Sequence, residues 1–185
     1  PGSLGGVETP IAYADGVVYA PLLNYSTWYT ATAFDGTRSS LADATGQLVA
    51  LDAATGEIVW DVSVPTALLA GATIINDLVF TGGLDGVVRA FSVADGTEVW
   101  SYQAGAGINA PFAASADSLI VAAGGPLIPS EDSLDPLPTP GAAVTVLNLG
   151  GEIQEVASPV AEEATPEAAA TGDGSGVAVN AVDIN

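Results

Sequence analysis

The chain of 185 residues has the length of one ordinary domain and a strongly acidic charge balance. It contains 22 Asp and Glu residues but only two basic ones, Arg38 and Arg89, so the formal net charge is −20. Nucleic-acid binding needs a basic surface that neutralises phosphates, so this balance excludes that function and argues against docking on anionic lipid. The sequence has no Cys and no His, which excludes disulfides, thiolate zinc sites and Ser–His or Cys–His catalysis. No apolar run is long enough to predict a membrane-spanning helix.

A hairpin of one apolar strand, two polar turn residues and a second apolar strand occurs three times along the chain. It covers residues 14–19, 75–80 and 116–121. The alternation of apolar and polar residues predicts strands, and the Asp or Asn residues between them are typical of tight turns. Asp15, Asp77, Asp95 and Asp117 are therefore interpreted as turn residues and not as catalytic acids.

A second strand–turn–strand pattern follows the first two hairpins and ends in tryptophan. Residues 50–60 (ALDAATGEIVW) return as residues 90–100 (AFSVADGTEVW), with Ala, Gly, Val and Trp at matching offsets. Four short strands in a unit of about forty residues are typical of a propeller blade. The sequence thus predicts an all-β fold with units at residues 7–64, 70–103 and 107–156, the last closing with strands at 143–147 and 152–153.

Two insertions interrupt this period between the second and third strands of a unit. One lies within residues 24–46 and the other, rich in proline, within 125–141. In a propeller such loops leave on the same face as the connections between blades, and loops on rigid scaffolds often carry function. The first insertion is the candidate ligand or partner loop, because stacking on a planar molecule or a protein suits its aromatic and basic residues. These residues are Tyr25, Trp28, Tyr29, Phe34 and Arg38. The alternative is that they pack down as a small satellite core.

The composition changes after residue 156. Residues 157–176 are rich in Ala, Pro, Glu, Thr and Gly and predict a flexible acidic linker. Residues 177–185 alternate apolar and polar side chains again, which we interpret as the first strand of a further, truncated domain.

The tryptophan-ended units resemble the pyrroloquinoline-quinone-like propeller repeat, whose consensus runs approximately Ala-Leu-Asp-x-x-Thr-Gly-x-x-x-Trp. Residues 50–60 fit it at almost every place, and residues 90–100 depart from it at Ser92 and Asp95. The resemblance covers residues 7–125 well and 140–156 poorly. It implies a partial propeller, about three blades of seven or eight, with the remaining blades in a longer natural protein. It also implies that tryptophans dock blade against blade near the next unit's glycine, so four residues are expected to be structural: Trp60, Trp100, Gly56 and Gly96. Residues 177–185 resemble the entry strand of a cupredoxin-type copper domain.

The family includes quinoprotein alcohol dehydrogenases and non-enzymatic relatives, among them an outer-membrane assembly lipoprotein, so two functions remain open. The first is a binding or scaffold propeller in the periplasm or at the cell surface, which takes a protein partner or a small ligand on its loop face. The second is part of a quinone-dependent dehydrogenase that passes electrons to a fused copper domain. No catalytic or metal-ligating residue can be carried over to this sequence. Pyrroloquinoline quinone and calcium are expected only in the full-length protein. Glu131, Asp132 and Asp135 could offer carboxylate oxygens to calcium, but they lack the regular spacing of a calcium-binding loop. This favours a solvated acidic loop.

Overall fold

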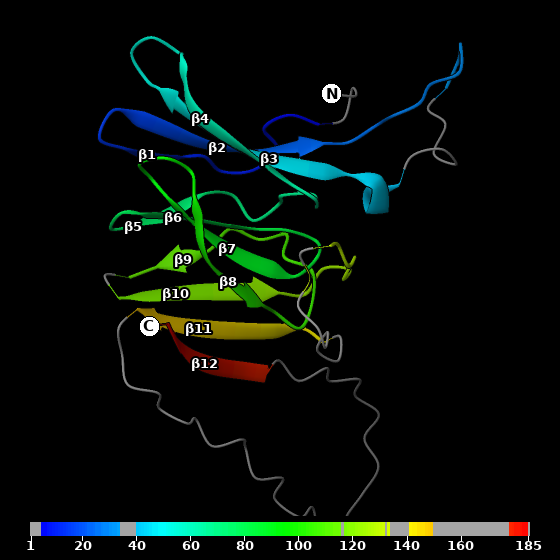
Figure 1. The fold of residues 1–185 in the computed structure, drawn as a ribbon. Coiled ribbons are helices and arrows are strands. Elements are labelled where there is room, and N and C mark those ends of the chain that lie inside the picture. Colours follow the sequence, from blue (N-terminus) through cyan, green and yellow to red (C-terminus); the bar gives the residue numbers. More distant parts are fainter. Residues whose placement is uncertain are drawn as a thin grey trace, which may run out of the picture.

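The computed structural model describes residues 5–33, 40–115, 117–131, 133, 141–149 and 178–184. These residues form three four-stranded sheets that lie one beside the next (Figure 1). The first sheet contains β1 (Ala12–Ala14), β2 (Val17–Asn24), β3 (Thr45–Asp52) and β4 (Ile58–Val64). The second contains β5 (Thr73–Ile75), β6 (Leu78–Gly82), β7 (Val87–Ser92) and β8 (Glu98–Gln103). The third contains β9 (Ala113–Ala114), β10 (Ser118–Ala123), β11 (Ala143–Leu149) and β12 (Ala178–Ile184). A single helical turn, η2 (Leu41–Asp43), precedes β3 in the described part of the chain.

The first and second sheets follow chain order, with every neighbouring pair antiparallel. The turn between β1 and β2 has Asp15 at φ 49° and Gly16 at φ 84°, and the turn between β5 and β6 has Asn76 at φ 54°. Positive φ at the centre of a two-residue turn matches the twist of the flanking strands, and Asp, Asn and Gly tolerate it best. The prediction of an all-β partial propeller built from four-stranded units is confirmed.

The turn between β3 and β4 and the turn between β7 and β8 have the same backbone but different side chains. In the first, Asp52 Oδ1 accepts hydrogen bonds from the N–H groups of Ala54 and Thr55 at 2.9 and 2.8 Å. In the second, Ser92 occupies the place of Asp52, and Asp95 Oδ1 accepts from the N–H of Thr97 at 3.0 Å. The departures of the second unit from the consensus therefore preserve a carboxylate in the turn. Backbone hydrogen bonds stabilise the charged form, so the pKa values of Asp52 and Asp95 lie below the ordinary value.

Two buried clusters join the sheets. Tyr19, Leu48 and Ala50 of the first sheet pack with Val79 and Phe91 of the second. The other cluster joins the second sheet to the third through large apolar side chains: Phe80, Val88, Ile108, Phe112, Leu119, Val121 and Leu147. The short strands β1, β5 and β9 also contact one another in sequence, which places them at the converging side of the three sheets.

Both insertions lie at one end of the sheets, which we call the loop face. Residues 25–44 connect β2 to β3, and residues 124–142 connect β10 to β11. The segment that precedes the first strand of each sheet forms an isolated bridge with a residue at or just beyond the end of that sheet's second strand. The three bridges are Gly6–Leu23, Leu68–Gly83 and Gly107–Gly125. The insertions and the inter-sheet connections therefore share this face. None of the described helices is long and apolar enough to cross a membrane.

The third sheet differs from the expectation in its fourth strand. The predicted closing strand at residues 152–153 and the linker at 157–176 lie outside the described residues. Beside β11 lies β12, the segment that we expected to begin a further domain, and the two strands run parallel from Ala143–Ala178 to Leu149–Ile184. A parallel pair requires a long connection, and residues 150–177 supply it. The unpaired edge of β11 explains why an alternating segment pairs there, because an open edge presents unpaired N–H and C=O groups.

Candidate functional site

Trp60 lies between the first and second sheets and contacts the turn of the following unit. Its Cε3 stands 2.6 Å from the position that a Cβ on Gly96 would occupy, so only glycine leaves room for the ring. Its indole N–H donates to the carbonyl of Val93 at 3.0 Å, and the Tyr19 hydroxyl donates to the same carbonyl at 3.3 Å. Burial, followed by the charge of Asp15, raises the pKa of Tyr19 above its ordinary value. These contacts hold two sheets together.

The other two residues expected to dock blades have different surroundings. Trp100 is half-buried against the cluster between the second and third sheets, stacked on Tyr102 at 6.2 Å and edge-on to Phe80 at 6.5 Å between ring centroids. Gly56 has the same positive φ as Gly96, 74° against 73°, but a Cβ there would meet nothing within 4 Å. The structure thus brings Trp60 and Gly96 together and leaves the space over Gly56 open.

The aromatic residues of the first insertion divide into packed and exposed ones. Tyr25 is half-buried against a loop-face cluster that includes Leu23, Ala44 and Leu84. Trp28 and Tyr29 keep 46% and 57% of their surface exposed. The satellite-core alternative thus describes Tyr25, while Trp28 and Tyr29 stand where a ligand can reach them. Phe34 and Arg38 lie outside the described residues.

A cavity of about 380 Å³ lies at the base of this insertion, where the chain leaves β2 and enters β3. Figure 1 shows the described start of the insertion, residues 25–33, extending away from the sheets, with the helical turn η2 next to the start of β3. Ser40 caps this turn by accepting a hydrogen bond from the N–H of Ala42 at 3.1 Å, and the turn places Asp43 at the cavity wall. The lining combines aromatic rings, hydroxyls, an amide and a carboxylate: Asn24, Tyr25, Thr27, Trp28, Asp43 and Thr45. The size falls within the range of small-molecule sites in proteins.

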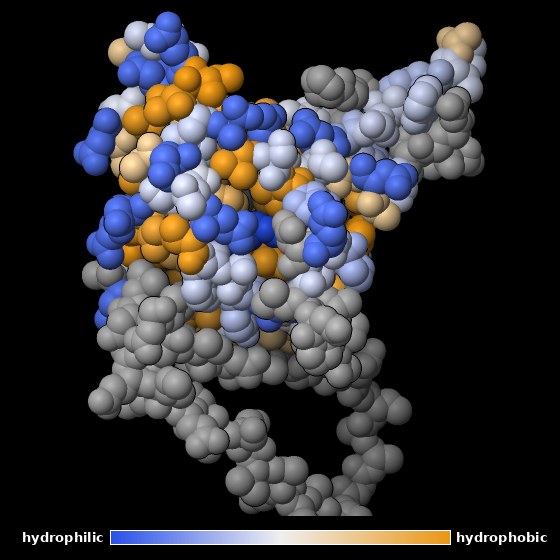
Figure 2. Space-filling view, viewed as in Figure 1, coloured by the Kyte–Doolittle hydropathy of each residue, from blue (hydrophilic) through white to orange (hydrophobic). Residues whose placement is uncertain are grey.

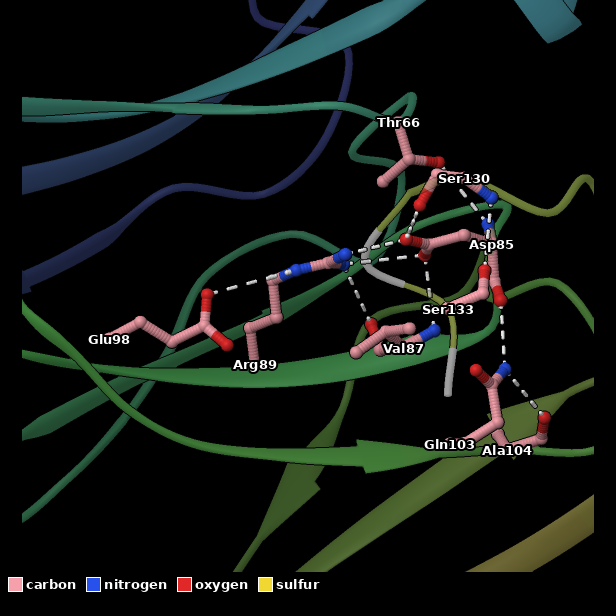
Figure 3. A network of polar contacts seen from close by, with 9 residues as sticks. All are labelled: Thr66, Asp85, Val87, Arg89, Glu98, Gln103, Ala104, Ser130 and Ser133. Atoms are coloured by element: carbon pink, nitrogen blue, oxygen red, sulfur yellow. Dashed lines mark hydrogen bonds and ion pairs between the residues drawn. The ribbon is translucent and has the colours of Figure 1, made fainter. Parts of the chain in front are cut away.

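A buried ion pair lies on the loop face of the second sheet (Figure 3). Arg89 on β7 and Asp85 in the turn before it are fully buried, with Arg89 Nη2 2.5 Å from Asp85 Oδ2. A second guanidinium nitrogen donates to Asp85 Oδ1 at 3.3 Å, and the N–H of Val87 donates to the same oxygen at 3.1 Å. A buried charge is tolerated only when it is paired and hydrogen-bonded, as both members are here.

This ion pair is also tied to neighbouring units. Ser130 of the second insertion donates its hydroxyl to Asp85 Oδ2 at 2.7 Å. The N–H of Asp85 donates to the Thr66 hydroxyl at 3.2 Å, and the side chain of Gln103 donates to the Asp85 carbonyl at 2.8 Å. Figure 3 shows these groups converging on one turn from the connection before the second sheet, the end of β8 and the loop of the third unit. The network therefore fixes the loops relative to one another.

Two carboxylates, Asp43 and Asp85, were not identified from the sequence. Asp43 belongs to no motif, and it reaches the cavity because the pairing of β2 with β3 sets Asn24 opposite Thr45, two residues after Asp43. Asp85 lies in the glycine-rich turn between β6 and β7, and the role of its carboxylate was not predicted. A usable signal did exist, because Arg89 is a single base inside an apolar strand, and such a charge requires a partner.

The described residues offer no metal centre. They contain no group of three or more His, Cys, Asp or Glu residues that could hold a metal ion. The Asp85 carboxylate already accepts hydrogen bonds from Arg89, Ser130 and Val87. These residues do not fit calcium or a quinone coordinated through it.

Comparison with known proteins agrees with the architecture. The family model described as "Outer membrane protein assembly factor BamB" matches residues 12–180. A quinoprotein ethanol dehydrogenase of Pseudomonas putida is 32% identical over 127 residues, which are 60% of this chain and 20% of that protein. The matched part thus spans about a fifth of the length of that curated relative.

Two solved structures are similar at lower identity. A quinohemoprotein alcohol dehydrogenase from Comamonas testosteroni has a TM-score of 0.48 at 21% identity, with 62% of this chain and 22% of that chain covered. BamB from Moraxella catarrhalis has a TM-score of 0.40 at 20% identity, with 63% and 43% covered. The family match over most of the chain, together with the repeated four-stranded sheets, identifies the chain as a member of the pyrroloquinoline-quinone-like repeat family of β-propellers.

Proposed function

We propose that this chain is the binding module of a β-propeller protein and that it binds a small ligand or a partner group through the first insertion on its loop face. The observation that carries the proposal is the cavity of about 380 Å³ beside the half-exposed Trp28. Exposure of an indole ring to water is energetically unfavourable and adds no packing to a core. Binding sites commonly present such residues on loops of a rigid scaffold. The sheets beneath supply the rigidity, through Trp60 and the Asp85–Arg89 network.

The proposed location is outside the cytoplasm, in the periplasm or at the cell surface. The support is the family description, which names an outer-membrane assembly factor. Fractionation of cells that produce the full-length protein tests this. Recovery of the protein in the cytoplasmic fraction would contradict it.

A panel of small compounds tests the binding function on the full-length protein. We expect at least one compound to raise the melting temperature of the wild type by a few degrees, because a ligand that binds only the folded state stabilises it. The same compound should fail to stabilise Trp28→Ala. The proposal is wrong if no compound gives a shift that depends on Trp28.

A second candidate is a part of a quinone-dependent alcohol dehydrogenase that passes electrons to a fused copper domain. The identity of 32% to a quinoprotein ethanol dehydrogenase supports it. The cofactor and its metal would be held by other blades, since the described residues do not fit them. The test is dye reduction with alcohols after addition of pyrroloquinoline quinone and calcium to the full-length protein. Absence of both turnover and quinone absorbance would exclude this candidate.

A further inference from the structure

The cavity of the first insertion joins an aromatic ring and a carboxylate in one wall. Trp28 and Tyr25 contribute rings, and Asp43 contributes the carboxylate. Asn24 and Thr45 add an amide and a hydroxyl at the ends of β2 and β3. The face of an indole ring is the most favourable aromatic surface for a cation, and a carboxylate within the same cavity adds direct attraction.

The charge of the molecule acts in the same direction. The net charge is −20, and the sequence has only two bases. Arg89 is fully buried against Asp85 and adds no positive charge to the surface. Arg38, the other base, belongs to the first insertion and lies outside the described residues. A field of one sign concentrates ligands of the opposite sign and repels anions.

We infer that the cavity binds an organic ammonium cation. The cation lies against the ring of Trp28, with the Asp43 carboxylate as counter-charge and with Asn24 and Thr45 around its polar substituents. This inference rests on the proposed function of the loop face and adds the class of ligand. A free quaternary ammonium compound and a lysine side chain of a partner present the same chemistry, so both are included as probes.

The test is isothermal titration calorimetry of the full-length protein with choline. The control ligand is 3,3-dimethylbutan-1-ol, which has the shape of choline without its charge. We expect choline to bind about ten-fold more tightly than the neutral alcohol, and its affinity to fall as salt screens the charges. Titration with Nα-acetyl-lysine N-methylamide, which keeps the charged ε-ammonium group, measures the affinity for a partner's lysine side chain. Tighter binding of the lysine compound assigns the site to a partner's side chain, and tighter binding of choline assigns it to a small molecule.

Three variants and one control locate the site. We expect Trp28→Ala to weaken choline binding about ten-fold and Asp43→Asn about three- to ten-fold. Glu57→Gln removes an exposed carboxylate from the turn at the opposite end of β3 and should leave the affinity unchanged. Melting temperatures establish that each variant is folded. Trp28→Phe keeps an aromatic face and should retain most of the binding, which separates loss of the ring from loss of the loop.

Three results would overturn the inference. If neither choline nor the lysine compound binds, or if choline binds equally to wild type, Trp28→Ala and Asp43→Asn, the cavity is not a cation site. Equal affinity for choline and its neutral analogue shows that charge is not recognised, while the binding function of the loop face stands. The panel of small compounds distinguishes this result from failure of the binding function itself. In that case no compound would give a shift in melting temperature that depends on Trp28.

Discussion

Two tryptophans illustrate how the same side chain serves different purposes in this chain. Trp60 packs its ring on Gly96 of the next unit and donates a hydrogen bond across the sheet boundary. Trp28 stands half-exposed at the cavity of the first insertion. Contacts between units therefore assign Trp60 to stability, whereas the exposed Trp28 is the residue that we propose for binding.

Substitution of each tryptophan by alanine separates the two roles. We expect Trp60→Ala to lower the free energy of unfolding by about 3 kcal/mol, the low end for truncation of a large aromatic side chain, because the ring is only half-buried. Trp28→Ala should change it by less than about 0.5 kcal/mol, as is usual for a surface substitution. Urea denaturation of the propeller measures both. Equal losses would mean that the insertion is part of the core.

The buried pair of Arg89 and Asp85 leads to a second prediction at the level of single residues. Arg89→Met leaves the Asp85 carboxylate buried without its counter-charge and should lower the free energy of unfolding by about 3–5 kcal/mol. The double variant Arg89→Met, Asp85→Asn removes the buried charge and should be more stable than the single variant. Urea denaturation checks the pair. A single variant as stable as wild type would show that the ion pair is dispensable.

At the level of elements, the repeated turns conserve a hydrogen-bonding pattern while exchanging the residues that provide it. Asp52 serves the turn between β3 and β4, whereas Asp95, three positions later in its own unit, serves the turn between β7 and β8. The turn is specified by a carboxylate near a glycine of positive φ, and its exact position can vary. This is why the second unit folds in the same way despite its departures from the consensus.

The lowered pKa of Asp52 gives these turns a pH dependence. A pKa below the ordinary value in the folded state means that the charged carboxylate stabilises the fold above about pH 4, and that this contribution is lost as pH falls through the folded value. Asp52→Asn should therefore be less stable than wild type at pH 7, with a difference that shrinks as pH falls below 4. Thermal unfolding between pH 2 and pH 7 measures this. Glu57→Gln, which removes another carboxylate of the same turn, is the control; a pH profile of Asp52→Asn parallel to wild type would refute the prediction.

For the whole molecule, the outer face of the first sheet is the feature that remains to be explained. Tyr13 and Ile58 keep 66% and 61% of their surface exposed, and both lie in one cross-strand row with Val18 and Leu51. Figure 2 shows hydrophobic side chains over β4 on this part of the molecule. Gly56 lies open in the same sheet, in the position where its counterpart Gly96 is covered by an indole ring. An apolar face of this kind is expected to pack against a further unit.

A pair of glycine substitutions tests this packing. Gly96→Ala should destabilise strongly, because it adds a clash with the Trp60 ring to the strain of a positive φ. In the 185-residue chain, Gly56→Ala should cause only the strain, about 1–2 kcal/mol. In the full-length protein we expect Gly56→Ala to be as harmful as Gly96→Ala, because a ring of a further unit covers it. Unfolding midpoints of both variants in both proteins decide this, and a mild Gly56→Ala in the full-length protein would show that the face stays uncovered.

Much of the architecture could be predicted from the sequence because it depends on local chemistry. Alternating apolar residues and turn residues such as Asp15, Gly16 and Asn76 determine strands and hairpins within a few neighbours along the chain. The forty-residue repeat then placed the units and both insertions. The resemblance to a known repeat predicted the docking role of tryptophan, and Trp60 does contact Gly96.

Only the tertiary structure decided which residues meet across long distances. It placed Asp43 in the cavity with Trp28, and Ser130 on the carboxylate of Asp85, 45 residues away. It also paired β12 with β11, where an alternating sequence alone could not distinguish a new domain from a strand of the same sheet. The physical reason is that local patterns determine whether a segment is a strand or a turn, whereas the choice of partner depends on open edges, buried charges and the space that folding leaves between units.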